Sequence, residues 1–207
     1  MNRYRKNKAI SNNKKYRKIS LRNENLMSEK QRNHFKDITV GFMKIANPDI
    51  NLGIEDAKSI TKDGKKYLVN SKNKIIWKNN ERKNGEWFLN IMGGKLKRLP
   101  EINSTEGVKM ADFKYFPIKS KPFFLENKEI ILKSSQSKAG INNIFHKIEE
   151  SINQSEVFII DVTDGKLTDI EILERLDLVF RHPKIKNFRK ILLIKNKNKL
   201  FGIFTDK

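Results

Sequence analysis

The feature that most constrains the fold of this chain is an unbroken apolar run, Val157-Phe158-Ile159-Ile160, closed by Asp161. Strands with apolar side chains on both faces occur in sheets that are covered by helices on both sides. The run therefore predicts a central strand of an α/β fold. Thr168 and Glu171 have the spacing of a capping box, which predicts that a helix follows this strand.

The remaining pattern supplies helices and strands around this central strand. Apolar residues at helical spacing predict helices over 80–92, 141–154 and 168–182. Shorter apolar runs predict strands at 66–69, 74–77, 95–100, 108–118, 128–133, 191–194 and 200–204, of which the first two and the last two form hairpins. The predicted fold is an α/β (α+β) domain over 66–207, with a central mixed or antiparallel sheet flanked by helices.

The N-terminal residues 1–27 contain nine Lys and Arg against one acid, Glu24. Such a segment buries too little apolar surface to offset the entropy of ordering it, so we predict a disordered basic arm. The arm would either hold phosphates without sequence preference or serve only as a solubilising leader or linker. The candidate nucleic-acid contacts are Arg3, Arg5, Lys14, Lys15, Arg17 and Lys18. A capping box at Ser28–Gln31 then predicts an amphipathic helix, and with a linker it fills residues 28–65.

The charge of the chain favours an anionic partner. Lys and Arg number 44 against 24 Asp and Glu, which gives a formal net charge of +20. Phosphate polymers are the commonest partners of such a surface, although an AT-rich genome, an acidic lipid or an acidic protein would also account for it. The absence of cysteine excludes disulfides, thiolate metal sites and a cysteine nucleophile. The sequence shows neither an apolar run long enough to span a bilayer nor a signal peptide.

Two residues on consecutive predicted strands indicate phosphodiester chemistry. Asp112 lies beside the start of one strand and Lys133 at the end of the next, as in a nuclease core with Asp followed by Glu-x-Lys on the following strand. In such a core, carboxylates hold a divalent cation against a phosphate, and the lysine orients water or stabilises developing charge. Ile131 stands where the acid is expected. Glu129, on the same face of a strand, is therefore the candidate displaced ligand for Mg²⁺ together with Asp112.

Other polar residues leave two alternatives open. Glu86 on the preceding helix and Gln154 at the end of the next would complete a metal site. A metal-free cleavage of RNA by its own 2′-hydroxyl would instead use Lys133, His146 and the polar segment Ser134–Ser137, which includes Ser135. That segment precedes a predicted helix, so Ser137 and its neighbours are candidate phosphate donors or ordinary helix caps.

Five stretches of the chain, which span roughly its last two thirds, carry a resemblance to a known family. They are NGEWFLNIMGGKLKRLPEI (84–102), VKMADFKYF (108–116), EIILKSSQS (129–137), NQSEVFIIDVTD (153–164) and KILLIKNKNKLFGIF (190–204). This pattern resembles the C-terminal tRNase toxin domains of contact-dependent growth inhibition proteins (CdiA) and related phage and mobile-element nuclease modules. The resemblance points to functional roles for Asp112, Lys133, Ser134–Ser137, Gln154 and Asp161.

The resemblance also implies a biological setting. It implies an endoribonuclease toxin that cleaves tRNA and is held silent by a cognate immunity protein. The protein would act in a bacterial cytoplasm, either its own or that of a recipient cell reached through a larger carrier. The chain departs from the family pattern at Ala111 and Ile131. Two other classes therefore stay open: a non-catalytic nucleic-acid-binding protein on a decayed nuclease core, and a structural protein of a phage or mobile element.

Overall fold

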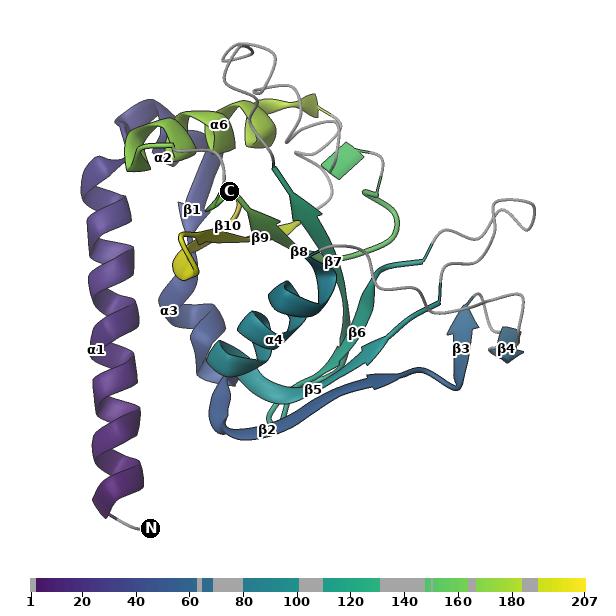
Figure 1. Ribbon diagram of the computed structural model, residues 1–207. Helices are drawn as coiled ribbons and strands as arrows, with labels where there is room; N and C mark the ends of the chain where they lie inside the picture. Colours follow the sequence, from purple (N-terminus) through teal and green to yellow (C-terminus); the bar gives the residue numbers. More distant parts are fainter. Residues whose placement is uncertain are drawn as a thin grey trace. The chain divides into compact units, whose positions relative to one another are not determined.

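The computed structural model describes residues 3–62, 65–68, 80–100, 110–130, 148–149, 151–163, 167–183 and 190–207 (Figure 1). The chain forms two compact units. The first holds Met1–Lys44, Ile130–His146 and Val162–Lys207, and the second holds Ile45–Glu129 and Lys147–Asp161. Helices accompany parallel and antiparallel strand pairs, which confirms the predicted fold class of an α/β protein with a mixed sheet flanked by helices.

The second unit is built on a mixed arrangement of strands. In spatial order these are β2 (Asn47–Asp56), β5 (Gly93–Arg98), β6 (Phe113–Phe116), β7 (Phe123–Glu129) and β8 (Val157–Asp161). The pairs β2–β5 and β7–β8 are parallel, whereas β5–β6 and β6–β7 are antiparallel. Every residue of β8 is buried, as predicted for the apolar run that ends at Asp161.

A separate two-stranded sheet contains the first of the predicted strands. It consists of β3 (Ser59–Lys62) and β4 (Lys65–Leu68), which pair antiparallel. The sequence pattern had paired residues 66–69 with residues 74–77, which lie outside the described part of the chain. The strand at 65–68 thus finds its partner on its N-terminal side.

Helix α4 (Glu81–Met92) packs closely on β2, β5 and β6. A Cβ at Gly85 would lie 2.9 Å from Ile54 Cδ1 and 3.3 Å from Phe113 Cζ, so the glycine permits a close approach of helix and strands. The helix ends at Gly93, as the sequence predicts. This residue has φ of 68°, and a Cβ there would lie 1.9 Å from the Asn47 carbonyl oxygen. Only glycine tolerates both conditions.

The two faces of this sheet differ in chemistry because side chains alternate along each strand. The register pairs Leu96 with Tyr115 and Phe113 with Leu125, and these four buried residues lie on the face that α4 covers. The alternate positions therefore lie on the opposite face. They are Lys95, Lys97, Lys114, Phe116, Phe124, Glu126 and Lys128, with Asp112 just before β6.

The first unit combines helices with three antiparallel strands. Its helices are α1 (Arg3–Leu26), α2 (Glu29–His34), α3 (Thr39–Phe42) and α6 (Asp169–Arg181), and its strands, in spatial order, are β1 (Phe35–Asp37), β10 (Lys199–Asp206) and β9 (Ile191–Asn196). Both predicted capping boxes are confirmed, one at Ser28 and one at Thr168. The C-terminal hairpin is also confirmed, with Lys197 and Asn198 in its left-handed turn.

The N-terminal segment differs from the predicted disordered arm, because α1 is a helix of 24 residues. From residue 13 onward, one side of α1 is buried through Tyr16, Ser20 and Asn23, followed by Met27. The helix predicted to begin at the Ser28–Gln31 capping box is also interrupted, since β1 separates α2 from α3. The arm is thus held by a largely polar contact that an apolar-periodicity argument cannot detect.

Asn23 is the central residue of this contact, and its replacement by alanine is expected to destabilise the fold. Its Nδ2 donates to Asp37 Oδ2 (2.7 Å) and to the Phe201 carbonyl (3.1 Å), and its side chain is fully buried. Losing these donors leaves buried acceptors unsatisfied, at a cost of about 2 kcal/mol. Urea denaturation should show this decrease for Asn23→Ala but not for Asn25→Ala, which removes an exposed amide from the same helix. Equal midpoints for the two variants would contradict the prediction.

Candidate active site

Asp112 and Glu126 face each other on neighbouring strands. The antiparallel register pairs Phe113 with Leu125, which places Asp112 directly opposite Glu126. The backbone N–H of Asp112 donates to Glu126 Oε2 (3.1 Å), and the backbone N–H of Asn127 donates to Asp112 Oδ2 (2.8 Å). Residues opposite each other in an antiparallel pair project from the same face of the sheet. Both carboxylates therefore lie on the face that α4 does not cover.

Lys128 joins this pair from the same strand as Glu126. The two residues are separated by one position, so their side chains share a face, and Lys128 Nζ lies 2.6 Å from Glu126 Oε1. Glu126 is buried and the Lys128 side chain retains 19% exposure. Glu126-Asn127-Lys128 thus supplies the acid-x-Lys element on the strand after Asp112. This is the arrangement that the sequence pattern predicts at residues 131–133.

Helix α4 supports the site through its first turns. Asn84 Nδ2 donates to Asn127 Oδ1 (2.9 Å), which fixes the residue between Glu126 and Lys128. Glu81, also buried, is close enough for its charge to act on Asp112. The helix therefore positions the strand that carries the acid and the lysine, and it adds a third carboxylate to the electrostatics.

The surroundings of Asp112 raise the pKa of its carboxyl to about 7. The largest cause is burial, followed by the nearby negative charge of Glu126, and Glu81 adds to the increase. The N–H of Asn127 and the charge of Lys128 lower the pKa without cancelling it. A carboxyl held in this way binds either a proton or a cation near neutral pH. The Asp112–Glu126 pair is therefore suited to hold positive charge.

Mg²⁺ fits the donors present at this pair. It prefers carboxylate oxygens and is commonly bound by one or two carboxylates, with waters and substrate phosphate in its remaining positions. Within the described ranges no group of three or more His, Cys, Asp or Glu side chains has the geometry of a complete protein cage. Asp112 and Glu126 would thus hold an Mg²⁺ whose other ligands come from water and substrate.

Glu129 was predicted as the second metal ligand, and the register corrects this assignment. Because Glu129 is three residues from Glu126, its side chain lies on the other face of β7. There its Oε1 accepts a hydrogen bond from Asn80 Nδ2, and its register partner on β8 is Asp161. Glu129 and Asp161, which is buried, therefore lie on the α4 side of the sheet, away from the face of Asp112.

The other predicted site residues lie outside the described part of the chain or belong to other elements. Lys133, His146 and the segment Ser134–Ser137, with Ser135 and Ser137, lie outside the described residues. Gln154 is in a turn, where its backbone N–H donates to the Ser151 carbonyl (2.8 Å). The arm residues belong to α1 of the other unit. Of these, Lys14, Lys15, Arg17 and Lys18 are exposed, and Arg3 and Arg5 fall in the first turn of the helix.

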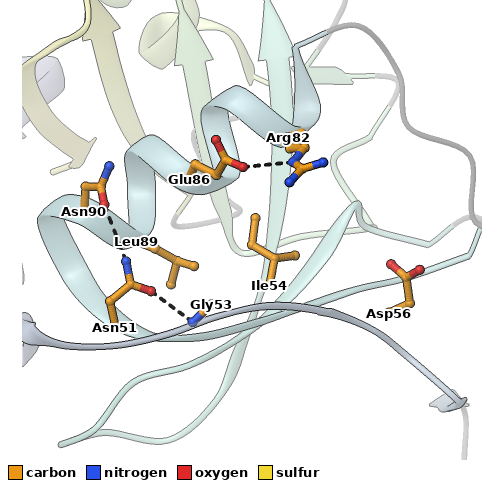
Figure 2. Close-up of a pocket in the computed structure, with 8 residues that line it drawn as sticks. All are labelled: Asn51, Gly53, Ile54, Asp56, Arg82, Glu86, Leu89 and Asn90. Carbon is orange, nitrogen blue, oxygen red and sulfur yellow. Dashed lines mark hydrogen bonds and ion pairs between the residues drawn. The ribbon is translucent and has the colours of Figure 1, made fainter.

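Glu86 lies in a different place, a pocket of about 570 Å³ between β2 and α4 (Figure 2). Its Oε1 lies 2.9 Å from Arg82 Nε, and the two side chains point toward each other along the solvent side of the helix. Asn51 and Asn90 also line this pocket. The charges that act on Asp112 come instead from Glu126, Glu81 and Lys128. Glu81, in the first turn of α4, is thus the acid that this helix contributes to the site.

The sequence analysis missed Glu126, Lys128 and Glu81. The signal was the acid-x-Lys spacing of Glu126 and Lys128 directly after the apolar residues 123–125. That stretch lies between the strands predicted at 108–118 and 128–133, and it follows Pro122, so the sequence predicts a connection there. No comparable signal marks Glu81, which is one of many acids in helices.

Comparison with known proteins adds no family to this description: no family model, curated protein or solved structure matches the chain significantly. Within the residues that the structure describes, no helix combines the length and apolar character needed to cross a membrane.

Proposed function

We propose that this protein is a metal-dependent endoribonuclease that hydrolyses a phosphodiester bond at Asp112, Glu126 and Lys128. The observation that carries the proposal is the direct opposition of two carboxylates with a lysine beside them. Asp112 and Glu126 are register partners on adjacent strands, and Lys128 contacts Glu126 on the same face. Asp followed by Glu-x-Lys on the next strand is the nuclease pattern that the resemblance and the strand order also support.

Each residue has a definite role in this chemistry. Asp112 and Glu126 hold a divalent cation, which polarises the phosphate and neutralises charge on its oxygens when bound. Lys128 Nζ, beside the pair, donates hydrogen bonds to the attacking water or to a phosphate oxygen that gains charge in the transition state. Hydrolysis forms a bond between the water oxygen and phosphorus and breaks the bond between phosphorus and the leaving ribose oxygen. A proton released by the attacking water balances the one that the leaving oxygen takes up. Asn84 and Asn127 keep the strand in register without contacting the substrate.

The substrate class follows from the charge of the chain and from the resemblance to tRNA-cleaving toxins. A formal charge of +20 favours a polyanion. Exposed Lys14, Lys15, Arg17 and Lys18 on α1 supply phosphate contacts that do not depend on sequence. We propose tRNA as the substrate and a cognate immunity protein as the partner. The setting is the cytoplasm of a bacterial cell, as in the toxins that the chain resembles.

The direct test is incubation of the purified protein with total bacterial tRNA, with Mg²⁺ and with a chelator, followed by denaturing gels and end mapping. The expected result is a set of discrete fragments that disappears on chelation. Fragments that persist in chelator and end in a 2′,3′-cyclic phosphate would contradict the metal-dependent mechanism and favour the metal-free one. A salt-dependent shift on a native gel without cleavage would instead identify a nucleic-acid-binding protein, whose contacts α1 would supply.

A further inference from the structure

The face of the β5–β6–β7 strands opposite α4 carries alternating cationic and aromatic side chains. We call this the lysine–phenylalanine face, defined as Lys95, Lys97, Lys114, Phe116 and Phe124. All five side chains lie on the side opposite α4 and all are partly exposed. A sheet usually covers such phenylalanines with a packed layer. Partly exposed aromatic rings beside lysines give this face both apolar and cationic groups that a ligand can contact.

The lysines of this face lie against the rings. Lys114 Nζ lies 5.7 Å from the centre of the Phe116 ring and 5.5 Å from that of Phe124, and Lys97 Nζ lies 5.5 Å from Phe116. These distances are within the range of cation–π contacts, which hold the ammonium groups beside the rings. A ligand on this face would therefore meet aromatic rings and positive charges side by side.

The face leads directly to the candidate active site. Lys114 on β6 is two residues after Asp112, and Phe124 is two residues before Glu126 on β7. At about 3.3 Å per residue, each of these two-residue separations amounts to roughly 7 Å along the strand. A chain lying on Phe124 and Phe116 would thus bring its next phosphate to the Asp112–Glu126 pair.

The charge around this face favours a polyanion. Lys119 and Lys121 are exposed on the connection between β6 and β7, adjacent to the face. Glu55 contacts two of its lysines, at 2.5 Å from Lys95 and 3.1 Å from Lys97. These lysines lower the pKa of Glu55 and hold it ionised, and Lys114 adds positive charge between the two rings. The surface therefore combines an excess of positive charge with stacking surfaces.

We infer that the lysine–phenylalanine face binds an unpaired stretch of the RNA substrate and directs it into the Asp112–Glu126 pair. This inference rests on the proposed function and adds the form of the substrate. Bases stack on aromatic side chains only when they are splayed out of a helix, and lysines track the phosphates of such a strand. A paired stem hides its base faces, so Phe116 would contribute nothing to binding it. The specified target is thus a loop or an end of an RNA rather than its stem.

Phe116 provides the sharpest test, because Phe124 also packs beside Ala57 and Leu99. The probe is a fluorescently labelled, single-stranded 2′-O-methyl oligouridine, measured by anisotropy in chelator so that cleavage plays no part. Phe116→Leu is expected to weaken binding about fivefold or more, as expected for the loss of one stacked base. Phe116→Tyr keeps the ring and should retain the parent affinity. Equal affinity of Phe116→Leu and parent protein would overturn the inference.

Two further measurements distinguish base stacking on this face from a general attraction between RNA and positive charge. Lys114→Gln should weaken binding and reduce the salt dependence by about one counterion, whereas Lys199→Gln, an exposed lysine at the start of β10, is the matched control for lost charge. A blunt RNA duplex should bind Phe116→Leu and parent protein equally. If Phe116→Leu weakened duplex and single strand alike, the preference for unpaired RNA would be wrong. Because binding is measured without metal, its result is independent of the cleavage assay, and failure of this inference can be distinguished from failure of the proposed function.

Discussion

Replacement of Glu126 by glutamine is expected to reduce Mg²⁺-dependent cleavage by about a hundredfold or more, since it removes one of the two carboxylates proposed to hold the cation. Glu126 lies opposite Asp112 and accepts its backbone N–H, so the amide fits the same space while lacking the charge. Binding of RNA in chelator should change little, because the phosphate contacts come from lysines elsewhere. Initial rates on tRNA at saturating Mg²⁺ measure the effect.

The matched control for this variant is Glu129→Gln. It makes the same chemical change on the same strand, three residues away and on the other face of the sheet. There the side chain accepts a hydrogen bond from Asn80 Nδ2, which a glutamine oxygen can also accept. Cleavage should survive in Glu129→Gln. The opposite outcome, with Glu129 essential and Glu126 dispensable, would refute the assignment of the site to the face of Asp112.

Replacement of Asp112 by asparagine is expected to abolish cleavage and at the same time to stabilise the metal-free protein at pH 8 by about 1–3 kcal/mol. The pKa of Asp112 is raised to about 7 in the fold, mainly by burial and then by Glu126, against an ordinary value of 3.8. At pH 8 the folded parent therefore carries an unfavourable buried charge. Asparagine keeps an acceptor for the Asn127 N–H and removes that charge.

The raised pKa of Asp112 also sets the direction in which the stability of the parent changes with pH. Below about pH 4 the carboxyl is protonated in both states and contributes nothing. Between about pH 4 and pH 7 the folded state binds the proton and the unfolded state does not, so the stability of the parent falls as pH rises. Above about pH 7 the stability that proton binding to Asp112 gives the folded parent is fully lost. Urea titrations at pH 5 and pH 8 should show a smaller decrease for Asp112→Asn than for the parent. Glu156→Gln, which changes an exposed carboxylate, should retain the parent decrease.

Much of the fold was predictable, because its helices and strands carry strong local signals. The capping box at Thr168, the glycine at the end of α4 and the buried run of β8 each correspond to an observed boundary or strand. These signals depend on a few neighbouring residues. Predictions made from them do not require knowledge of which strands pair.

The candidate site was only half predictable, because it depends on which strands pair and not on local signals alone. Asp112 could be chosen from its place beside a strand, but its partner depended on which of two successive apolar stretches pairs with β6. The run Ile130-Ile131-Leu132 is the more apolar, and it was preferred over Phe123-Phe124-Leu125. The register selects the earlier stretch, and it replaces Ile131 with Glu126 as the acid. Pairing between strands is a long-range choice that propensity does not encode.

The N-terminal helix was not predictable from composition. The first 27 residues have few apolar side chains, and the hydrogen bonds of Asn23 to Asp37 and Phe201 hold α1 to residues that are distant in the sequence. A buried amide leaves no periodic apolar signature. Tertiary contacts of this kind override the local argument for disorder.

Asp112 and Glu126 lie on two strands joined only by residues 117–122, and this has a consequence for the order of folding. A hairpin closes within about 1–10 μs, long before the parallel pairing of β7 with β8 closes a loop of more than twenty residues. We expect repulsion between the two carboxylates to oppose closure of this hairpin. A proton or a cation that neutralises the pair would then speed this step of folding.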